Sequence, residues 1–276
     1  MYQQNADQFP IEAKDAEYRR RMEACYPVHP EVFDHLYGKW SMLNGFQRTR
    51  GVLRLMAEVI HQLCVENNRD PMVMPGSLPM HTAADEELTR YLESSKHWET
   101  IINKEVDGKN SIPRIKDEQD PRYKYRQMAC RVARTILLGS APDVRSQDVR
   151  GIESSRIRLG TVIPEPAKDG KRWECQTSIS NDALATLTKS LSYLYSATDR
   201  YWYDTRPTLR KTAEDRKRGL EDSTVEMEIE GKMKKDWERG KSLTGLHICP
   251  ASDDVPDTSD GVRLVVLIPK TGTEKD

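Results

Sequence analysis

The chain has 276 residues, enough for two or three compact modules, and 32% of them are charged against 37% hydrophobic. The formal net charge of −1 excludes an overall basic field that would recruit DNA or an anionic membrane, so any nucleic-acid contact needs a local patch. Apolar residues nevertheless recur at regular spacing, which favours helical modules with thin cores over disorder.

The five cysteines are far apart, with no Cys-x-x-Cys pair and no histidine at metal-ligand spacing. Reduced thiols of this kind indicate a reducing compartment. The N-terminal residues lack the basic and apolar segments of a signal peptide, and no apolar run approaches the length of a membrane span. We therefore expect a cytoplasmic chain with no membrane partner.

Residues 1–70 are expected to form a helical module. A charged helix is predicted over 12–23, a second helix over 31–40 after Pro30, and a third from 46 to about 67. Helical spacing in the third helix predicts a buried stripe of Val52, Leu55, Met56, Val59 and Leu63. Arg50, Arg54 and His61 fall on another face.

Residues 71–120 are expected to be a connector, with a short extended piece, a helix opened by Thr82 and a polar loop. Residues 121–211 follow the order of a winged helix-turn-helix. An apolar face predicts a clear helix over 125–137, a weaker helix is expected over 149–157, and Ser180 or Asn181 caps a third. Alternating aromatics over 193–204 predict a β-hairpin.

Residues 212–276 are expected to hold a charged helix and an incomplete α/β segment. The helix, over 208–241, is predicted to break or bend at Gly219 and Gly231. Two short apolar runs, 243–249 and 262–268, predict buried strands on either side of an acidic loop. The expected fold class is thus mainly α with small β elements, an α+β arrangement.

No catalytic centre is predicted within the chain. Gly240-Lys241-Ser242 lacks the strand and the earlier glycine of a phosphate-binding loop, since Lys235 stands where that glycine belongs. The histidines form no HExxH motif, and no GxSxG motif occurs. The loop Asp253 to Asp257 has ligands suited to a divalent cation, but solvated carboxylates are commoner, so no metal site is predicted.

Two groups of basic residues are candidates for phosphate contacts. Arg48, Arg50 and Arg54 form a cluster of forked donors suited to phosphate oxygens, although a solvated basic face explains them equally well. Around the predicted wing, the candidates for nucleic-acid contact are Lys189, Arg200, Arg206, Arg210 and Lys211. With one lysine on the recognition helix, duplex binding and a purely architectural role are equally supported.

Several segments, taken in order, resemble a family of predicted AAA+-type ATPases of unknown function. That family is encoded beside DNA methyltransferases in prokaryotic defence clusters and is similar to the ATPases of the BREX and phage-growth-limitation systems. The matching segments span nearly the whole chain: Tyr26 to Pro30, Phe46 to Ala57, Arg131 to Ile136, the hairpin, and Asp254 to Asp257 with Arg263 to Leu267.

The resemblance implies that residues 1–70 are a helical lid and that Gly51-Val52-Leu53-Arg54 matches the Gly-x-x-Arg pattern of a sensor-2 arginine. Arg54 would then reach the γ-phosphate of ATP bound on a core preceding the lid, with Arg48 and Arg50 supporting it. The Walker segments of that core are absent, so the chain resembles an excised or split piece. We expect no cofactor and no ATPase activity from it alone, but ATP and Mg²⁺ in the full-length protein.

The expected partners are the upstream core or full-length protomers, with DNA and a DNA methyltransferase system as further candidates. The leading hypothesis is the non-catalytic lid and winged-helix portion of a defence ATPase. Two alternatives remain open from the sequence: a stand-alone DNA-binding regulator, and a protein-interaction adaptor that uses the helix over 208–241 as its docking surface.

Overall fold

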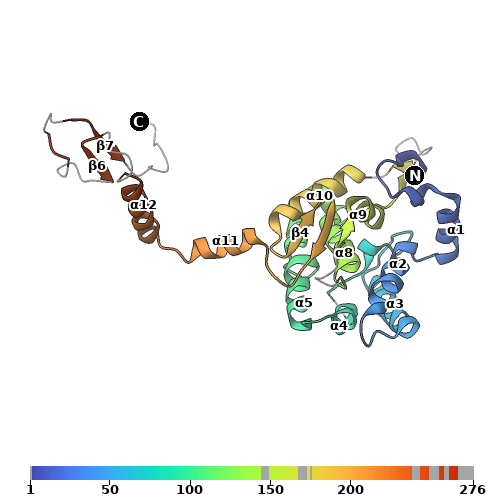
Figure 1. The fold of residues 1–276 in the computed structure, drawn as a ribbon. Helices are drawn as coiled ribbons and strands as arrows, with labels where there is room; N and C mark the ends of the chain where they lie inside the picture. The colour runs from blue at the N-terminus through green and yellow to red at the C-terminus, as the bar shows by residue number, and fades with distance from the viewer. Residues whose placement is uncertain are drawn as a thin grey trace. The chain divides into compact units, whose positions relative to one another are not determined.

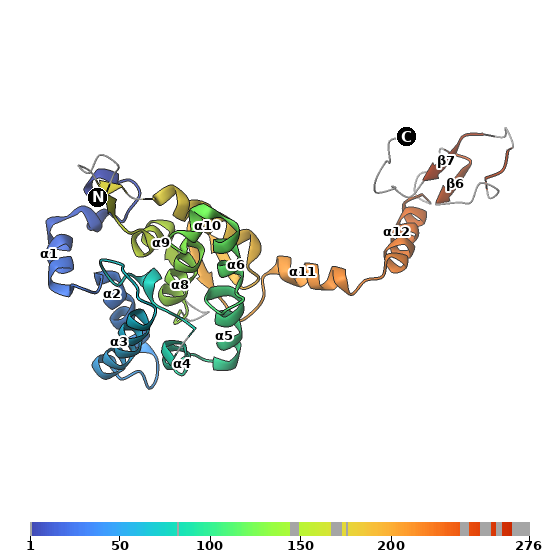
Figure 2. The same cartoon turned by 180° about the vertical axis from the view of Figure 1, so that it is seen from behind.

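The computed structural model describes residues 2–81, 83–143, 149–166, 173–174, 176–237, 243–248, 255–257 and 261–266. Contacts within the chain divide it into two compact units, Met1–Lys211 and Thr212–Asp276. Helices dominate and the sheets are small (Figures 1 and 2), which confirms the α+β class. No helix in the described ranges combines the length and the apolar character that a bilayer crossing requires.

The first unit begins with short 3₁₀ turns, η1 (Tyr2–Asn5) and η2 (Ile11–Lys14), before its α-helices. The first three predicted helices are found as α1 (Ala16–Cys25), α2 (Pro30–Gly38) and α3 (Arg48–Val65), with η3 (Trp40–Met42) after α2. The connector holds η4 (Pro75–Ser77), α4 (Ala83–Thr89), α5 (Ser95–Ile101), the π-helical turn η5 (Ile102–Val106) and α6 (Ile112–Gln119), and α7 (Pro121–Lys124) follows it. Thr82, the predicted cap of α4, lies outside the described residues.

Helix α8 (Met128–Ser140) lies among the other helices of this unit and is the clear helix that the sequence predicts (Figure 1). Every residue of α8 is buried. Two glycines allow its neighbours this close: a Cβ at Gly76 of η4 would lie 2.9 Å from Cβ of Arg131, and one at Gly139 would lie 2.6 Å from Ile152. Such contacts leave no room for side chains, so α8 is packed on all sides.

One hydrophobic core runs from Val28 to Tyr203 and includes residues from each of the ranges 1–70, 71–120 and 121–211. Buried hydrogen bonds cross the same divisions. Trp40 donates to the carbonyl of Leu138 at 2.7 Å, and the Tyr203 hydroxyl donates to the carbonyl of Glu105 at 3.0 Å. The main hydrophobic core of the first unit is therefore shared by all three ranges.

After α8, the chain forms β1 (Ile152–Glu153), α9 (Ser154–Thr161), α10 (Thr177–Ser190), β4 (Leu194–Ala197) and β5 (Arg200–Tyr203). The predicted hairpin is confirmed, with Thr198 and Asp199 both at positive φ in the tight turn. It gains a third strand that the sequence did not predict, because β1 pairs with β5 and the sheet order is β1-β5-β4. A separate pair joins β2 (Glu165–Pro166) to β3 (Trp173–Glu174).

Helix α10 begins at Thr177, three residues before Ser180 and four before Asn181, so the prediction that one of these two residues caps the helix is wrong. Both side chains have tertiary partners instead. The Ser180 hydroxyl is buried 2.9 Å from the Thr161 hydroxyl, and Asn181 accepts a hydrogen bond of 3.0 Å from Arg158. Packing against α9 therefore uses the polar groups that the sequence suggested for capping.

Helix α11 (Leu209–Arg218) contains the boundary between the two units, and α12 (Asp222–Trp237) follows. The predicted break at Gly219 is confirmed, whereas the one at Gly231 is wrong, since this glycine lies inside α12. A Cβ built at Gly231 would meet open space, since no described atom of another segment lies within 4 Å of it.

In the second unit, β6 (Gly245–Ile248) and β7 (Arg263–Val266) pair in parallel. The predicted burial of these strands is wrong for their described residues, because β6 is only half-buried and Leu264 and Val265 are exposed. Helix α12 packs against β6, yet much of the strand pair stays in contact with solvent. Asp253 and Asp254 of the predicted acidic loop lie outside the described residues.

Candidate functional site

Helix α3 places Arg50 and Arg54 on its solvent-facing side. The predicted stripe of Val52, Leu55, Met56, Val59 and Leu63 is buried, as the helical spacing required. Arg50 and Arg54 lie one turn apart on the exposed side. The backbone of Arg48 begins α3, but its side chain is outside the described part of the chain.

The Arg54 guanidinium is paired with a carboxylate at one edge, while much of the side chain is exposed to solvent. Its Nε lies 3.1 Å from the Oε2 of Glu87, a carboxylate that is 4% exposed, while the Arg54 side chain is 58% exposed. Glu87 also accepts a hydrogen bond from the Tyr91 hydroxyl at 2.8 Å and lies 3.5 Å from Arg90. The carboxylate would thus keep a cationic partner if the Arg54 guanidinium turned to an anionic ligand.

Gly51 lies on the packed side of α3, where the ring of Phe46 covers it. A Cβ at this position would meet Phe46 ring carbons at 3.3 Å, a contact tight enough to displace the ring. Beside the arginines, Leu53 and Ile60 are 66% and 47% exposed. Glycine and arginine of the Gly-x-x-Arg pattern therefore have different roles, one in packing and the other at the surface.

The predicted wing residues do not form one patch. Arg200 of β5 bonds to the segment just before β1. Its Nε donates to the carbonyl of Arg150 at 2.8 Å, and its Nη2 donates to the carbonyl of Gly151 at 2.7 Å. At the other end of the hairpin, Arg210 donates to the carbonyl of Leu191 at 2.9 Å, where α10 ends. Lys189 and Arg206 are exposed, and Lys211 is half-buried.

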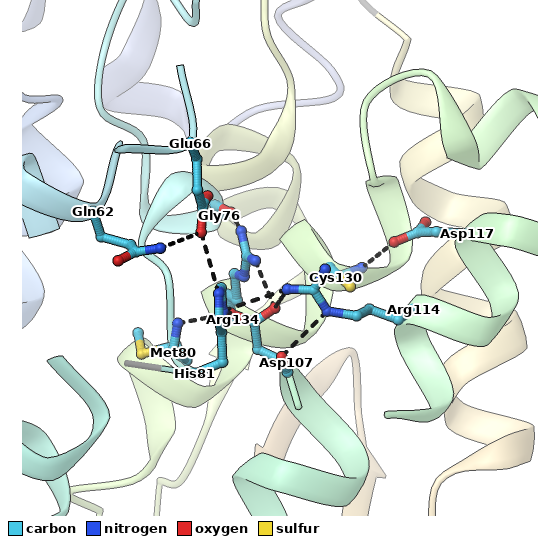
Figure 3. A network of polar contacts seen from close by, with 10 residues as sticks. All are labelled: Gln62, Glu66, Gly76, Met80, His81, Asp107, Arg114, Asp117, Cys130 and Arg134. Carbon is cyan, nitrogen blue, oxygen red and sulfur yellow. Dashed lines mark hydrogen bonds and ion pairs between the residues drawn. The ribbon is translucent and has the colours of Figure 1, made fainter. Parts of the chain in front are cut away.

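A second group of arginines, on α8 and nearby helices, was not predicted as a site. We define the arginine network as His81, Arg114, Arg126, Arg131 and Arg134 with their partners Asp70 and Asp107, and Figure 3 shows the part around Asp107. Arg131 and Arg134 are 4% and 5% exposed. Buried arginines require carboxylates and backbone carbonyls as partners, because an unpaired charge is costly inside a protein.

Asp107 is the fully buried centre of this network. Its Oδ1 accepts from Arg134 at 2.5 Å and from Arg114 at 3.1 Å, while its Oδ2 lies 2.8 Å from the His81 ring. The amide of Met80 also donates to Oδ2 at 2.7 Å. Burial alone would raise the pKa of Asp107, but Arg134 and His81 hold it at about 2, so the carboxylate is ionised.

Arg131 is held by three acceptors. It donates to Asp70 at 2.7 Å, to the carbonyl of Thr161 at 2.9 Å and to the Ser77 hydroxyl at 3.1 Å. Arg126 lies 3.7 Å from the other oxygen of Asp70. Each acidic partner is thus shared by at least two cations.

A cavity of about 470 Å³ opens beside the network. Its lining is mainly polar: Glu66, Asn68, Asp70, His81, Arg114, Lys124, Tyr125, Arg126, Gln127, Arg131 and Arg134. Within the described ranges, no group of three or more histidine, cysteine, aspartate or glutamate side chains is placed to hold a metal ion. The donors that converge here are suited to oxyanions.

The sequence contained one signal for this site, the segment Arg131 to Ile136 that carries part of the resemblance. Its partners could not be inferred from spacing, because Asp70 lies 61 residues from Arg131 and Asp107 lies 27 from Arg134. Two arginines on an otherwise apolar helix predict only that they must be paired if buried.

A family model described as DUF499 second domain matches residues 3–203, from η1 to the last residue of β5. No curated protein and no solved structure matches the chain.

Proposed function

The chain belongs to the family of DUF499 second domains, and we propose that it acts as the non-catalytic lid portion of a larger AAA+-like ATPase. The observation that supports this function best is the position of Arg54, which is held by Glu87 yet more than half exposed on the open side of α3. Catalytic machinery for ATP hydrolysis is assigned to a nucleotide-binding core elsewhere in the protein.

In this proposal, the exposed side of α3 faces the core. Leu53 and Ile60 supply apolar contact area beside the arginines, since exposed apolar side chains that gather on one face mark interaction surfaces. Arg54 exchanges its ion pair with Glu87 for the γ-phosphate of ATP, and Arg50 lies one turn away to add positive charge. Bound Mg²⁺ and ATP belong to the core, and the chain contributes the sensing arginine.

The test is ATP turnover in the protein that carries a nucleotide-binding core ahead of this chain. Arg54→Ala is expected to reduce turnover by about a hundredfold or more, as loss of a donor to transition-state charge does. Arg69→Ala removes an exposed arginine outside α3 and serves as the matched control. Unchanged turnover in Arg54→Ala would eliminate the sensor-2 assignment.

A second proposed function, duplex DNA binding, is favoured by the chain order α8, β1, α9, α10, β4, β5, with the hairpin next to the C-terminal end of α10. This order suits a winged helix in which α10 enters the major groove. Lys189 and Arg206 are the exposed basic residues placed to contact phosphates, because Arg200 and Arg210 donate to backbone carbonyls.

Fluorescence anisotropy with a labelled duplex and the whole chain tests this second function. Binding should weaken with salt, and Lys189→Gln with Arg206→Gln should reduce the slope of log K against log salt by about one for each phosphate that is no longer neutralised. A flat titration at low salt, or an unchanged slope in the double variant, would rule out duplex binding through the wing.

A further inference from the structure

The cavity beside the arginine network gathers more positive than negative charge. Five side chains of permanent positive charge line it: Arg114, Lys124, Arg126, Arg131 and Arg134. Four carboxylates lie in the cavity wall or contact these cations: Glu66, Asp70, Asp107 and Glu165. The surplus is one positive charge.

The sharing of carboxylates leaves cationic groups under-neutralised. Asp107 is shared by Arg114, Arg134 and His81, and His81 has Glu66 as a second partner. Asp70 is shared by Arg126 and Arg131, and Arg126 has Glu165 as a second partner. Because one carboxylate has a single charge to divide among these donors, an additional anion in the cavity would gain attraction from several guanidinium groups at once.

Arg134 provides a second, independent observation. Its side chain is 6% exposed and lines the cavity, and its Nε is buried with no hydrogen-bond partner among the described residues. Its other nitrogens contact Asp107 at 2.5 Å and the carbonyl of Gly76 at 3.4 Å. A buried donor without an acceptor costs free energy that a bound ligand would recover.

The exposed residues of the cavity lining, which we call its mouth, lie at the end of α7 and just after it (Lys124, Tyr125 and Gln127) and just after α3 (Glu66 and Asn68). Lys124, the last residue of α7, is exposed, and Tyr125 is 70% exposed. The Arg126 guanidinium lies 4.9 Å from the centroid of the Tyr125 ring. A volume of about 470 Å³ falls within the usual range of small-molecule sites. The opening therefore offers a lysine and an aromatic surface to a ligand whose charged part enters first.

We propose that this cavity binds a phosphate group, either inorganic phosphate or the phosphate of a small monoester. Arg114 and Arg134 donate to the phosphate oxygens from the inner wall, Lys124 does so from the mouth and Arg126 from beside it, and the shared carboxylates orient the arginines. The site is separate from the α3 surface and does not depend on the proposed lid function.

Arginine is the residue type that such a site needs. Its planar guanidinium presents parallel donors that match two oxygens of a phosphate, and it is more weakly hydrated than an ammonium group. A purely structural ion-pair network would use the same arginines but would not respond to phosphate. The two explanations therefore differ in a measurable way.

The test is to titrate the whole chain with sodium phosphate, against sodium chloride at matched ionic strength, by calorimetry and by thermal unfolding. Phosphate is expected to bind saturably and to raise Tm, since a ligand specific for the folded state stabilises it. Arg114→Gln and Lys124→Gln, which change half-buried and exposed side chains, should each weaken binding by about tenfold.

Lys104→Gln, an exposed lysine that does not line the cavity, is the matched control and should bind phosphate as the unchanged chain does. A thermal shift no larger than that of chloride, with inorganic phosphate and with a phosphate monoester alike, would overturn the proposal. The proposal would also be overturned if phosphate raised the Tm of Arg114→Gln and Lys124→Gln as much as that of the unchanged chain, because phosphate would then bind elsewhere.

Adenosine 5′-monophosphate distinguishes the two sources of the phosphate group. Equal affinity for this nucleotide and for inorganic phosphate identifies a site for the free ion. A tighter nucleotide complex whose advantage is lost in Tyr125→Ala identifies a monoester that stacks at the mouth. Both results support a phosphate site, and failure of both ligands to bind beyond the chloride control refutes it.

Discussion

Helices α3 and α8 each have two arginines about one helical turn apart, but the two helices lie in contrasting environments. On α3, Arg50 and Arg54 face solvent, whereas on α8, Arg131 and Arg134 are buried. Arg54 has a carboxylate partner at one edge, while Arg134 contacts the ionised and fully buried Asp107. The difference shows that an arginine is buried where distant segments supply acceptors and remains exposed where its own surface has few.

The largest expected contrast is in stability. Arg134→Ala would leave Asp107 buried with one charge partner fewer, so the free energy of unfolding should fall by about 3–5 kcal/mol, as when a buried pair is broken. Arg54→Ala removes an exposed partner and should cost below about 1 kcal/mol. Urea unfolding followed by circular dichroism measures both variants.

Arg69→Ala, outside both helices and exposed, sets the baseline for losing a surface arginine. If Arg134→Ala cost no more than Arg54→Ala, the two pairs would be energetically alike and the contrast between α3 and α8 would be only geometric.

The second-largest expected effect is the loss of folding stability at low pH, and one of the two histidines responsible, His35, packs against α8. Burial lowers the pKa of His35 to about 3, with Lys39 contributing, and burial lowers that of His29 to about 3 with Arg21 contributing. The unfolded chain takes up these protons near pH 6.5, but the folded chain does not until about pH 3. Stability present above pH 6.5 is therefore lost as pH falls toward 3, by up to about 1.4 kcal/mol per pH unit for each histidine.

His35 faces α8, since a Cβ at Gly139 would lie 3.1 Å from its ring, whereas His61 is exposed on α3. His35→Gln is expected to reduce the pH dependence of the unfolding free energy between pH 6.5 and 4, and His61→Gln to leave it unchanged. Urea unfolding at a series of pH values measures this slope. An equal slope in all three proteins would show that histidine burial does not set the acid limit.

The sequence predicts the helices well where apolar residues recur at helical spacing, as in α3 and α8. It also predicts the hairpin, because aromatic alternation and a short polar turn are local signals. It misses β1, since two residues are too few to show alternation. Helix breaks at glycine are predicted unevenly: the chain ends α11 before Gly219 but continues α12 through Gly231.

For the candidate sites, the sequence indicates the surface arginines of α3 but not the arginine network. Local spacing shows which residues share a helical face, and this was sufficient for Arg50 and Arg54. The network depends on Asp70 and Asp107, which reach Arg131 and Arg134 only through tertiary folding. The wing arginines illustrate the same limit, because Arg200 bonds to a backbone carbonyl 50 positions away.

The burial of α8 on every side has a consequence for how the chain folds. The elements packed against it include η4, more than 50 residues before it, and β5, about 60 residues after its last turn. Loop closure over such separations is slow compared with helix formation, so the rate at which this core forms should be set by long-range docking. During synthesis, α8 stays without its final wall until Tyr203 has left the ribosome, and until then its apolar face is open to chaperones and to aggregation.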